Sequence, residues 1–375
     1  MKVCHLSSAH RGLDMRIYHK ECVSLARAGY ETHLVITASS AEVRQAAAQS
    51  VTLHALPPAR GRLARMSKQA WLCYRMARNL NAEIYHFHDP ELIPYGMLLK
   101  LLGKHVIYDV HEDLPRDILD KEWIPLWMRK LVARASETVE HVGARWFFDI
   151  VAATPFIARR FRRVSPGAIN VNNYPMPDEL APPGGSSQRR KQVCYAGGIE
   201  RIRGLKIIVE TLPLVPDVRL VLCGRFSDPD FEDELRGMPG WQQVDYLGYV
   251  DRPQLQRVMS ESMAGLVTLM PVPGYVDANP TKMFEYMSAE LPVIASDFPL
   301  WRQILEDAGA GICVDPQSPQ AIASAISSIM HNPDEAARMG RGGRAAIIGK
   351  YNWPKELETL LHLYAHVHQE SGRTN

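Results

Sequence analysis

The sequence predicts an α/β protein made of two doubly wound domains, each a parallel sheet with helices on both faces. Along the chain, short apolar segments of strand length alternate with longer segments that have helical periodicity. This alternation stops at a stretch rich in proline and glycine and then starts again. The length of 375 residues agrees, because it corresponds to about two domains of ordinary size.

The first series of strands and helices occupies residues 1–173, which we expect to form the N-terminal domain. Its strands are short apolar runs, as in parallel sheets that are buried on both faces. The expected strands are 2–6, 32–37, 51–56, 82–86, 105–110 and 150–153. The expected helices are 16–29, 63–80, 91–102 and 125–146, and the first of them ends at a glycine.

Residues 174–191 are the expected linker, because residues 174–187 include four prolines, two glycines and two serines. The alternation resumes in residues 192–350, the expected C-terminal domain. Strands are predicted there at 192–196, 218–223, 264–269, 292–296 and 311–314, and helices at 205–213, 252–262, 281–289, 317–331 and 333–347. A last amphipathic helix is predicted in residues 351–370, with Pro354 near its start.

The composition argues against several classes of protein. With 46% hydrophobic and 22% charged residues, the chain is typical of a folded globular protein rather than a disordered one. A net charge of +2 argues against a nucleic-acid partner. No apolar run approaches the roughly 20 residues that span a bilayer, and Ser7 and Ser8 interrupt the N-terminus before a signal-peptide core forms. We therefore expect a cytoplasmic protein.

The six cysteines are scattered, without the spacing of a metal site or a disulfide framework. Several lie in short apolar runs, so we expect small buried residues in a reducing compartment. His86 and His88 have a spacing that two metal ligands could use, but no third ligand is evident in the sequence. We predict no metal site.

Charge is divided unevenly along the chain. Residues 1–172 hold 24 Lys and Arg against 16 Asp and Glu, whereas the remainder holds 19 against 25. In the basic half, Trp123, Trp127 and Leu131 follow helical spacing among basic residues. Such a helix either lies on an anionic membrane surface or packs its tryptophans into the core. The positive balance favours the first interpretation, a peripheral contact with an anionic membrane.

A helix start in the second half is suited to bind phosphate. The helix predicted after Pro280 leaves the amides of Thr281, Lys282 and Met283 without intrahelical partners, at the positive end of the helix dipole. One turn later, Glu285 could accept hydrogen bonds from ribose hydroxyls. The alternative is that Asp277 and Glu285 simply favour a helix N-terminus.

This stretch resembles a known signature. Asp277 and Glu285, with seven residues between them, are similar to the acid-x7-acid motif of retaining glycosyltransferases of the GT-B fold, in the large family four. The phrase from Asn279 to Met287 resembles the branch that builds bacterial surface polysaccharides. The family has Glu at both ends, whereas this chain has Asp first. The resemblance covers residues 1–365 and implies two Rossmann-like domains facing across a cleft, with the last helix crossing back to the N-terminal domain.

The resemblance also implies roles for residues at matching positions. After residue 196 the family usually carries an Arg and, five residues later, a Lys that hold the donor diphosphate, and this chain has Gly198 and Arg203 there. The implied diphosphate-binding residues are Gly198, Arg203, Thr281, Lys282 and Met283. The implied catalytic residues are His111, Asp277 and Glu285, of which Glu285 also binds the ribose. The implied base-binding residues are Gly224, Tyr249 and Val250, and the acceptor-side residues are Gly12, Arg16, His88 and Asp89.

The implied activity is transfer of a sugar from a nucleoside diphosphate sugar, with UDP-sugars favoured, to a hydroxyl of a glycan or lipid-linked acceptor in exopolysaccharide synthesis. The nucleotide sugar is then a co-substrate, with no cofactor or metal, and the enzyme works in the cytoplasm or at the inner face of the cell membrane. Two alternatives share the fold: a nucleotide-sugar epimerase, and a non-catalytic sugar-nucleotide-binding scaffold that tolerates the departures at Gly198 and Asp277. A hinge-type binding protein would need export.

Overall fold

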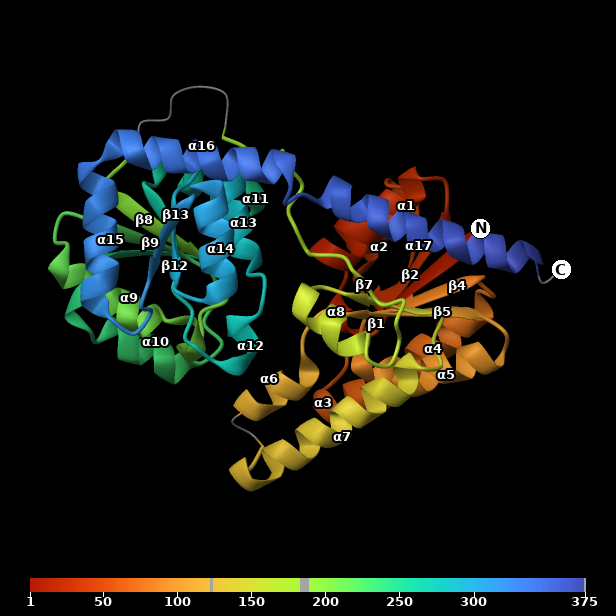
Figure 1. Cartoon of the computed structure of the whole chain (residues 1–375). Coiled ribbons are helices and arrows are strands. Elements are labelled where there is room, and N and C mark those ends of the chain that lie inside the picture. The colour runs from red at the N-terminus through yellow and green to blue at the C-terminus, as the bar shows by residue number, and fades with distance from the viewer. Residues whose placement is uncertain (122–123, 183–188, 374–375) are drawn as a thin grey trace. The chain divides into compact units, whose positions relative to one another are not determined.

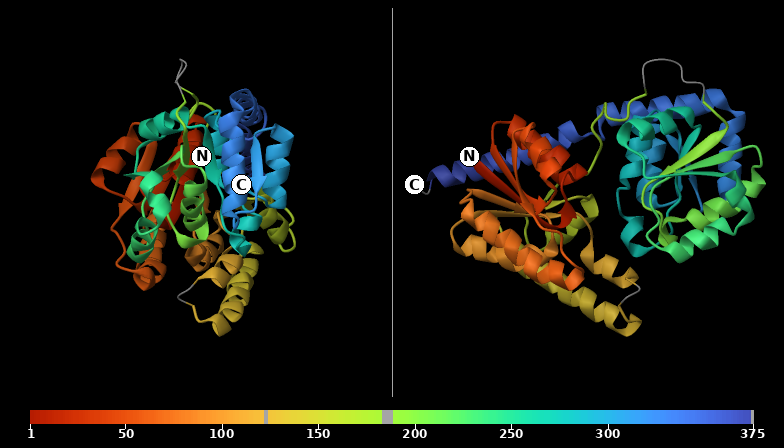
Figure 2. Two further views of the ribbon diagram at one scale, coloured as in Figure 1. Left: turned by 90° about the vertical axis from the view of Figure 1, so that its left-hand side faces the viewer. Right: turned by 180° about the vertical axis from the view of Figure 1, so that it is seen from behind.

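The computed structural model describes residues 1–121, 124–182 and 189–373. These residues form two compact units, each with its own parallel sheet and its own helices (Figures 1 and 2). Unit 1 consists of Met1–Asn173 together with Pro354–Asn375, and unit 2 is Tyr174–Trp353. Both are α/β structures with helices on the two faces of the sheet, which confirms the predicted fold class.

Unit 1 has a seven-stranded sheet in the order β3-β2-β1-β4-β5-β6-β7, and all of its pairs are parallel. The strands are β1 (Lys2–Arg11), β2 (Glu31–Thr37), β3 (Val51–Leu56), β4 (Ile84–Phe87), β5 (His105–Val110), β6 (Asp149–Ala152) and β7 (Ile169–Asn170). The strand order reverses between β1 and β4. The carboxyl ends of these strands therefore form a topological switch point, where such sheets bind ligands.

The helices of unit 1 are η1 (Met15–Cys22), α1 (Val23–Arg27), α2 (Ser40–Ala47), α3 (Arg62–Ala64), η2 (Arg65–Gln69), α4 (Ala70–Asn79), η3 (Pro90–Leu92), α5 (Ile93–Leu101), α6 (Leu114–Asp120), α7 (Leu126–Ala144), α8 (Pro155–Phe161) and the last helix, α17 (Trp353–Arg373). η1 is a π-helix, a form that is frequent at functional sites. Asp14 begins it by accepting the backbone N–H groups of Arg16 and Ile17 at 2.8 and 2.9 Å.

Unit 2 has a six-stranded parallel sheet in the order β10-β9-β8-β11-β12-β13. Its strands are β8 (Gln192–Ala196), β9 (Arg219–Cys223), β10 (Val244–Gly248), β11 (Ala264–Val267), β12 (Val293–Ser296) and β13 (Gly311–Val314). Its helices are η4 (Arg201–Arg203), α9 (Leu205–Thr211), η5 (Leu212–Leu214), α10 (Pro229–Arg236), η6 (Pro239–Gln243), α11 (Arg252–Glu261), α12 (Pro273–Val276), α13 (Thr281–Ser288), α14 (Pro299–Ala308), α15 (Pro319–His331) and α16 (Pro333–Gly349). The switch point of this sheet lies between β8 and β11.

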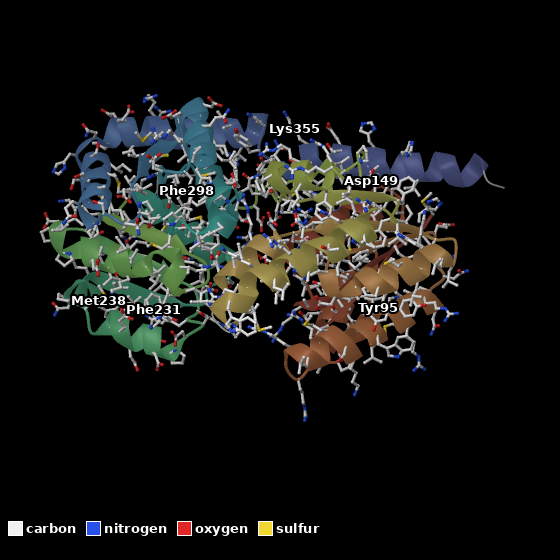
Figure 3. All side chains as sticks on the ribbon, turned by 60° about the horizontal axis from the view of Figure 1, so that its bottom comes forward. Tyr95, Asp149, Phe231, Met238, Phe298 and Lys355 are labelled. Atoms are coloured by element: carbon white, nitrogen blue, oxygen red, sulfur yellow. The ribbon has the colours of Figure 1, made fainter. Side chains whose placement is uncertain are left out.

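Aromatic side chains fill the core of each unit. In unit 1 the ring of Phe87 stacks on that of Tyr108, with centroids 4.7 Å apart. In unit 2, Phe298 packs against the fully buried Trp301 with the same centroid separation. Figure 3 shows Phe298 and Phe231 among the side chains of unit 2, and Tyr95 and Asp149 among those of unit 1. Each unit therefore has a hydrophobic core of its own.

The segment expected to be a linker is in part a structural element of unit 2. Tyr174 and Leu180 are buried in the core of unit 2, where the Tyr174 ring lies 4.7 Å from that of Phe284. The carbonyl of Pro177 accepts the hydroxyl of Ser288 at 3.0 Å. The content of proline, glycine and serine suggested an interdomain linker, but these apolar side chains cover α13, so residues 174–182 pack as part of unit 2. Residues 183–188 of the expected linker lie outside the described residues.

The aromatic and basic helix of unit 1 has its apolar residues on the surface. On α7, Leu126, Trp127 and Leu131 are 77%, 79% and 64% exposed. The alternative that this stripe packs into the core is therefore wrong for Trp127 and Leu131, while Trp123 lies outside the described residues. Among the helices that the structure describes, each is too short or too polar to cross a bilayer.

Candidate active site

Two glycines approach each other closely, one in the turn after β8 and the other directly after β9. Gly197 has a φ of 141° and donates its N–H to the carbonyl of Cys223 at 2.9 Å. At the end of β9, Gly224 has a φ of 149°, and a Cβ there would lie 1.9 Å from the carbonyl oxygen of Gly197. Glycine is favoured at both positions by the positive φ, and at Gly224 also by this close approach. Gly224, which we expected to bind the base, therefore packs against the turn after β8, and base binding by it stays a prediction.

Two cations converge on this turn. The Lys282 ammonium lies 3.7 Å over the ring of Tyr195, and a Cβ on Gly197 would lie 3.1 Å from it and 4.0 Å from Nη1 of Arg203. Arg203 also flanks Gly198, with its Nε 3.5 Å from a carboxylate oxygen of Glu200. Among the described residues, the buried Nζ of Lys282 has no hydrogen-bond partner.

Burial is costly for the Lys282 ammonium, and its surroundings add to the cost. Burial first, and then the charge of Arg203, lower the pKa of Lys282 well below its usual value. The carboxylates of Glu285 and Glu200 raise it by less. The sequence predicted a diphosphate contact for Lys282 through its amide only. The structure also places the Lys282 side chain beside Gly197, next to the turn that contains Gly198.

The amides at the start of α13 are in part used by the protein. The N–H of Met283 donates to the carbonyl of Pro280 at 3.0 Å, so it is satisfied within the helix. The geometry therefore opposes the predicted phosphate contact of Met283 and leaves Thr281 and Lys282 as the amides to consider. Pro280 precedes the helix with an extended backbone, which suits a helix start.

Glu285 is held by a residue that the sequence did not reveal. Arg252, the first residue of α11, donates to Glu285 at 2.7 Å and to Glu179 at 2.8 Å through different nitrogens. The Glu285 and Glu179 side chains are only 13% and 19% exposed. Arg252 therefore fixes the carboxylate that we expected to bind ribose. Neither Arg252 nor Glu179 has a local motif that could have identified it, since Glu179 lies in the presumed linker.

The remaining predicted donor residues also belong to unit 2. Asp277 follows α12, and the loop after it is fixed by Trp301, whose indole N–H donates to the carbonyl of Ala278 at 2.7 Å. Tyr249 is 70% exposed beyond β10, with the Arg225 guanidinium 5.0 Å over its ring. Val250 packs against the core of unit 2. Base binding by Tyr249 and Val250 stays a prediction.

In unit 1, Asp89 organises the switch point between β1 and β4. One of its oxygens accepts the hydroxyl of Ser7 at 2.8 Å and the N–H of Ser8 at 2.7 Å. The other lies 3.1 Å from Nδ1 of His10. This holds the His10 ring 5.1 Å from that of His111. Burial lowers the pKa of His10, but the hydrogen bond and charge of Asp89 outweigh burial and raise it.

His111 is positioned by a buried carboxylate, Asp109. Nε2 of His111 lies 3.1 Å from an Asp109 oxygen and 3.0 Å from Nδ1 of His88. Burial favours the neutral form of Asp109, but Arg16 and then His111 outweigh it and hold the pKa of Asp109 well below its usual range. His88 is itself buried, which lowers its pKa to about 3. His111 is the partly exposed end of this network.

Three of the four residues predicted on the acceptor side are polar groups inside unit 1. Arg16 is 4% exposed, and two of its nitrogens donate to Asp109 at 2.8 and 3.0 Å. His88 and Asp89 are 3% and 2% exposed. Gly12 is buried too, where a Cβ would lie 1.9 Å from the carboxylate of Glu42. Their burial opposes direct contact with an acceptor and indicates that they position the loop and His111.

One group of described residues has the composition of a metal site. Ligand atoms of Glu21, His86, His88 and Asp109 lie within 4.8 Å of one another. The sequence showed only the two histidines, because Glu21 and Asp109 come from distant elements. Arg16 already serves both carboxylates, with its Nε 3.1 Å from Glu21. Burial and Asp109 raise the pKa of Glu21 well above its usual value, so Glu21 holds a proton. The charges of Arg16 and Asp109 then cancel, and the cluster has no net charge.

Two family models match the chain. The one described as "Glycosyl transferase 4-like domain" matches residues 17–172, and the one described as "Glycosyl transferases group 1" matches residues 178–346. The chain belongs to the family-four-like glycosyltransferases. This confirms the resemblance drawn from the spacing of Asp277 and Glu285, and it makes the protein a glycosyltransferase.

Relatives of this glycosyltransferase span most of its length. A phosphatidyl-myo-inositol mannosyltransferase of Mycobacterium leprae is 22% identical over 82% of this chain and 80% of its own. Sucrose-phosphate synthase from Thermosynechococcus elongatus is a structural neighbour with a TM-score of 0.77 and 17% identity, over 99% of this chain and 100% of its own. Anabaena HepE, solved with UDP and glucose, has a TM-score of 0.76 and 14% identity, over 98% of this chain and 100% of its own. The glycosyltransferase therefore has the GT-B fold, as predicted.

Proposed function

We propose that this glycosyltransferase is a retaining enzyme that takes a sugar from a nucleoside diphosphate sugar and passes it to a glycan or lipid-linked acceptor in surface-polysaccharide synthesis. The observation that carries the proposal is the buried ammonium of Lys282 beside the guanidinium of Arg203. Burial and the charge of Arg203 disfavour the charged form of Lys282 unless an anion joins the two groups, and the N-terminus of α13 also favours an anion. A donor diphosphate supplies that anion. The UDP in the HepE structure supports a uridine donor.

In the proposed reaction, the acceptor oxygen bonds to the anomeric carbon on the face from which the diphosphate leaves. The bond from that carbon to the phosphate oxygen breaks, its electron pair stays on the oxygen, and the acceptor proton passes to it. Lys282, Arg203 and the amides of Thr281 and Lys282 would stabilise the developing negative charge. These groups supply the charge that a divalent metal supplies elsewhere, so we propose transfer without one. Glu285 would bind the ribose, and Asp277 and His111 the sugar.

We also propose that the enzyme works at the cytoplasmic face of a membrane. The support is the exposed apolar stripe of Leu126, Trp127 and Leu131 on α7, in the basic half of the chain. Large apolar side chains that are this exposed indicate an interaction surface. The acceptor would then be presented by the lipid that carries it.

The test is nucleotide binding by wild type and by Lys282→Met, which keeps the length of the side chain without its charge. We expect UDP to raise the melting temperature of the wild type, and Lys282→Met to bind UDP about 30-fold more weakly, corresponding to about 2 kcal/mol for a charged hydrogen bond. Lys206→Met is the matched control, because Lys206 is exposed on α9 and pairs with Glu234. EDTA should leave both the UDP shift and sugar transfer unchanged.

Turnover distinguishes the proposal from its alternatives. Donor hydrolysis followed by NMR should release first the sugar anomer with the configuration of the donor. Release of the opposite anomer contradicts a retaining enzyme, and conversion of the donor into a second nucleotide sugar identifies an epimerase. If neither UDP nor GDP shifts the melt of the wild type, the diphosphate site is wrong.

A further inference from the structure

Three helices of unit 1 enclose a basic pocket that the donor chemistry does not use. α6, α7 and α8 lie next to one another in unit 1 (Figure 1). They border a cavity of about 440 Å³. This volume is ordinary for a small-molecule site. Two carboxylates, those of Asp113 and Glu137, line it. The cationic residues that line it are Arg116, Lys130, Arg134, Arg159, Arg160 and Arg163. This excess of positive charge predicts an anionic ligand.

Arg160 is a buried cation of the pocket with donors that lack a hydrogen-bond acceptor among the described residues. Its side chain is 9% exposed, and Nη1 donates to Glu140 at 2.8 Å. Nε and Nη2 are buried and have no hydrogen-bond partner among the described residues, with Nε 3.6 Å from a carboxylate oxygen of Asp113. Buried donors without an acceptor cost free energy, and a ligand oxygen would satisfy them.

The other cations are arranged around an aromatic ring. The Arg116 guanidinium lies 3.8 Å over Phe156, and that of Arg159 lies 5.9 Å from the same ring. Stacking on one aromatic ring fixes the orientation of these planar groups. Arginine forks suit phosphate, which can accept several such bonds at once. The pocket is therefore suited to a phosphate or diphosphate group.

The surroundings of the pocket favour a lipid over a soluble phosphate. Trp127, Lys130 and Arg134 are spaced three and four residues apart on α7 and so share one face. Lys130 and Arg134 line the pocket, whereas Trp127 is 79% exposed beside them. A basic pocket with exposed large apolar side chains at its rim matches a phosphate at a membrane surface.

We propose that this pocket binds the phosphate or diphosphate group of a membrane-embedded lipid. That the lipid carries the acceptor rests on the proposed function, whereas the binding itself rests on the pocket alone. The phosphate would bond to Arg160, Arg116 and Arg134, and Trp127 and Leu131 would enter the interface around the lipid chain.

The test is co-sedimentation of the full chain with vesicles in 150 mM salt. We expect strong binding to phosphatidylcholine vesicles containing 20% phosphatidic acid, and weak binding to phosphatidylcholine alone. The double variant Arg134→Gln/Arg163→Gln should weaken binding to the vesicles with phosphatidic acid at least tenfold, because both residues are exposed and line the pocket. Arg27→Gln/Arg44→Gln is the matched control, since it removes the same charge from exposed positions on α1 and α2. An equal loss of vesicle binding in both double variants would refute the pocket as the binding site.

Two further readouts separate the possible failures. Pyrophosphate should compete with the vesicles for the pocket. Binding of pyrophosphate without binding of vesicles would refute the proposal that the ligand is a lipid. The UDP melting shift should persist in Arg134→Gln/Arg163→Gln, because unit 2 carries the proposed donor site. Loss of vesicle binding with an intact UDP shift thus supports the pocket. A wild type that binds these vesicles but not UDP would refute the proposed function and leave this inference standing.

Discussion

At the scale of single residues, the donor site that we propose in unit 2 depends on one buried lysine. Lys282 lies over Tyr195 and beside Arg203, and its pKa is lowered first by burial and then by the charge of Arg203. An anion bound between the two cations would reverse both effects by stabilising the charged ammonium. The protonation of Lys282 is therefore linked to donor binding.

This linkage predicts proton uptake when the donor binds. Between the lowered pKa of the free enzyme and the higher pKa of the complex, Lys282 is neutral before binding and charged after it. UDP binding measured by calorimetry at several pH values from 7 to 10, in two buffers of different ionisation enthalpy at each pH, should therefore show uptake of up to one proton within this window. The affinity should fall, by up to tenfold per pH unit, as the pH rises through this window.

Lys282→Met provides the comparison, because it keeps the fold of the turn but has no proton to gain. Its weaker binding heat should not depend on the buffer. Buffer-independent heat in the wild type would mean that the ammonium is already charged in the free enzyme, and it would contradict this account of Lys282.

At the scale of elements, Arg252 ties α11 to α13 and to the segment before β8. It bonds both Glu285 and Glu179, so the carboxylate that we propose to bind ribose is positioned from two other parts of unit 2. Removing Arg252 leaves Glu285 without the partner that fixes its orientation. The proposed consequence is a loss of ribose recognition rather than a loss of diphosphate binding.

Arg252→Ala should therefore reduce the discrimination between UDP and 2′-deoxy-UDP. We expect the wild type to bind UDP about tenfold more tightly than the deoxy form, which corresponds to about one hydrogen bond to a charged group. In Arg252→Ala this ratio should fall toward one, with deoxy-UDP binding nearly unchanged, and Glu179→Gln should lie between. A purely structural role would weaken both nucleotides equally and leave the ratio intact.

The bounds of β3, β5, β8 and β13 agree with the predicted ranges. β5 and β8 are buried parallel strands, which are nearly continuous apolar runs, whereas β3 and β13 are edge strands whose sequences are still mostly apolar. β10 was not predicted, since it is an edge strand with half-buried positions and a charged residue, Asp245, within it. α2, α6, α8, α10 and α14 were not predicted either. Several of these helices are short, and their stability comes from packing rather than from their own periodicity.

The candidate site was predictable where a motif is local and not where it is assembled by the fold. The spacing from Asp277 to Glu285 is visible in one stretch of sequence. By contrast, the neighbours Arg252 and Glu285 are 33 residues apart, and Arg16 and Asp109 are 93 residues apart. No periodicity connects such residues, so Arg252, Glu179 and His10 could only be recognised once the strand order was known.

At the scale of the whole molecule, the two units differ in charge, and each has its own core. Unit 1 holds 26 Lys and Arg against 19 Asp and Glu, and unit 2 holds 17 against 22. Unit 1 also takes α17 from the far end of the chain. Leu360, Tyr364 and Val367 are buried in it, and the Tyr364 hydroxyl lies 2.7 Å from Nδ1 of His86. The C-terminal helix is therefore part of the core of unit 1, next to its histidine network.

This arrangement predicts two unfolding transitions with different sensitivities. Each unit has its own core, so calorimetry should resolve two transitions, of which UDP raises only that of unit 2. Leu360→Ala should lower the other transition by roughly 5–10 °C, because a buried Leu→Ala change costs about 2–5 kcal/mol and each kcal/mol shifts a domain of this size by a few degrees.

Leu305→Ala is the matched control, since Leu305 is equally buried on α14 of unit 2 and should lower only the UDP-sensitive transition. If Leu360→Ala lowers the UDP-sensitive transition instead, α17 stabilises unit 2, and its assignment to unit 1 is wrong. A single transition that both substitutions and UDP shift together would mean that the units unfold as one. The basic unit could then not respond to a lipid independently of the donor.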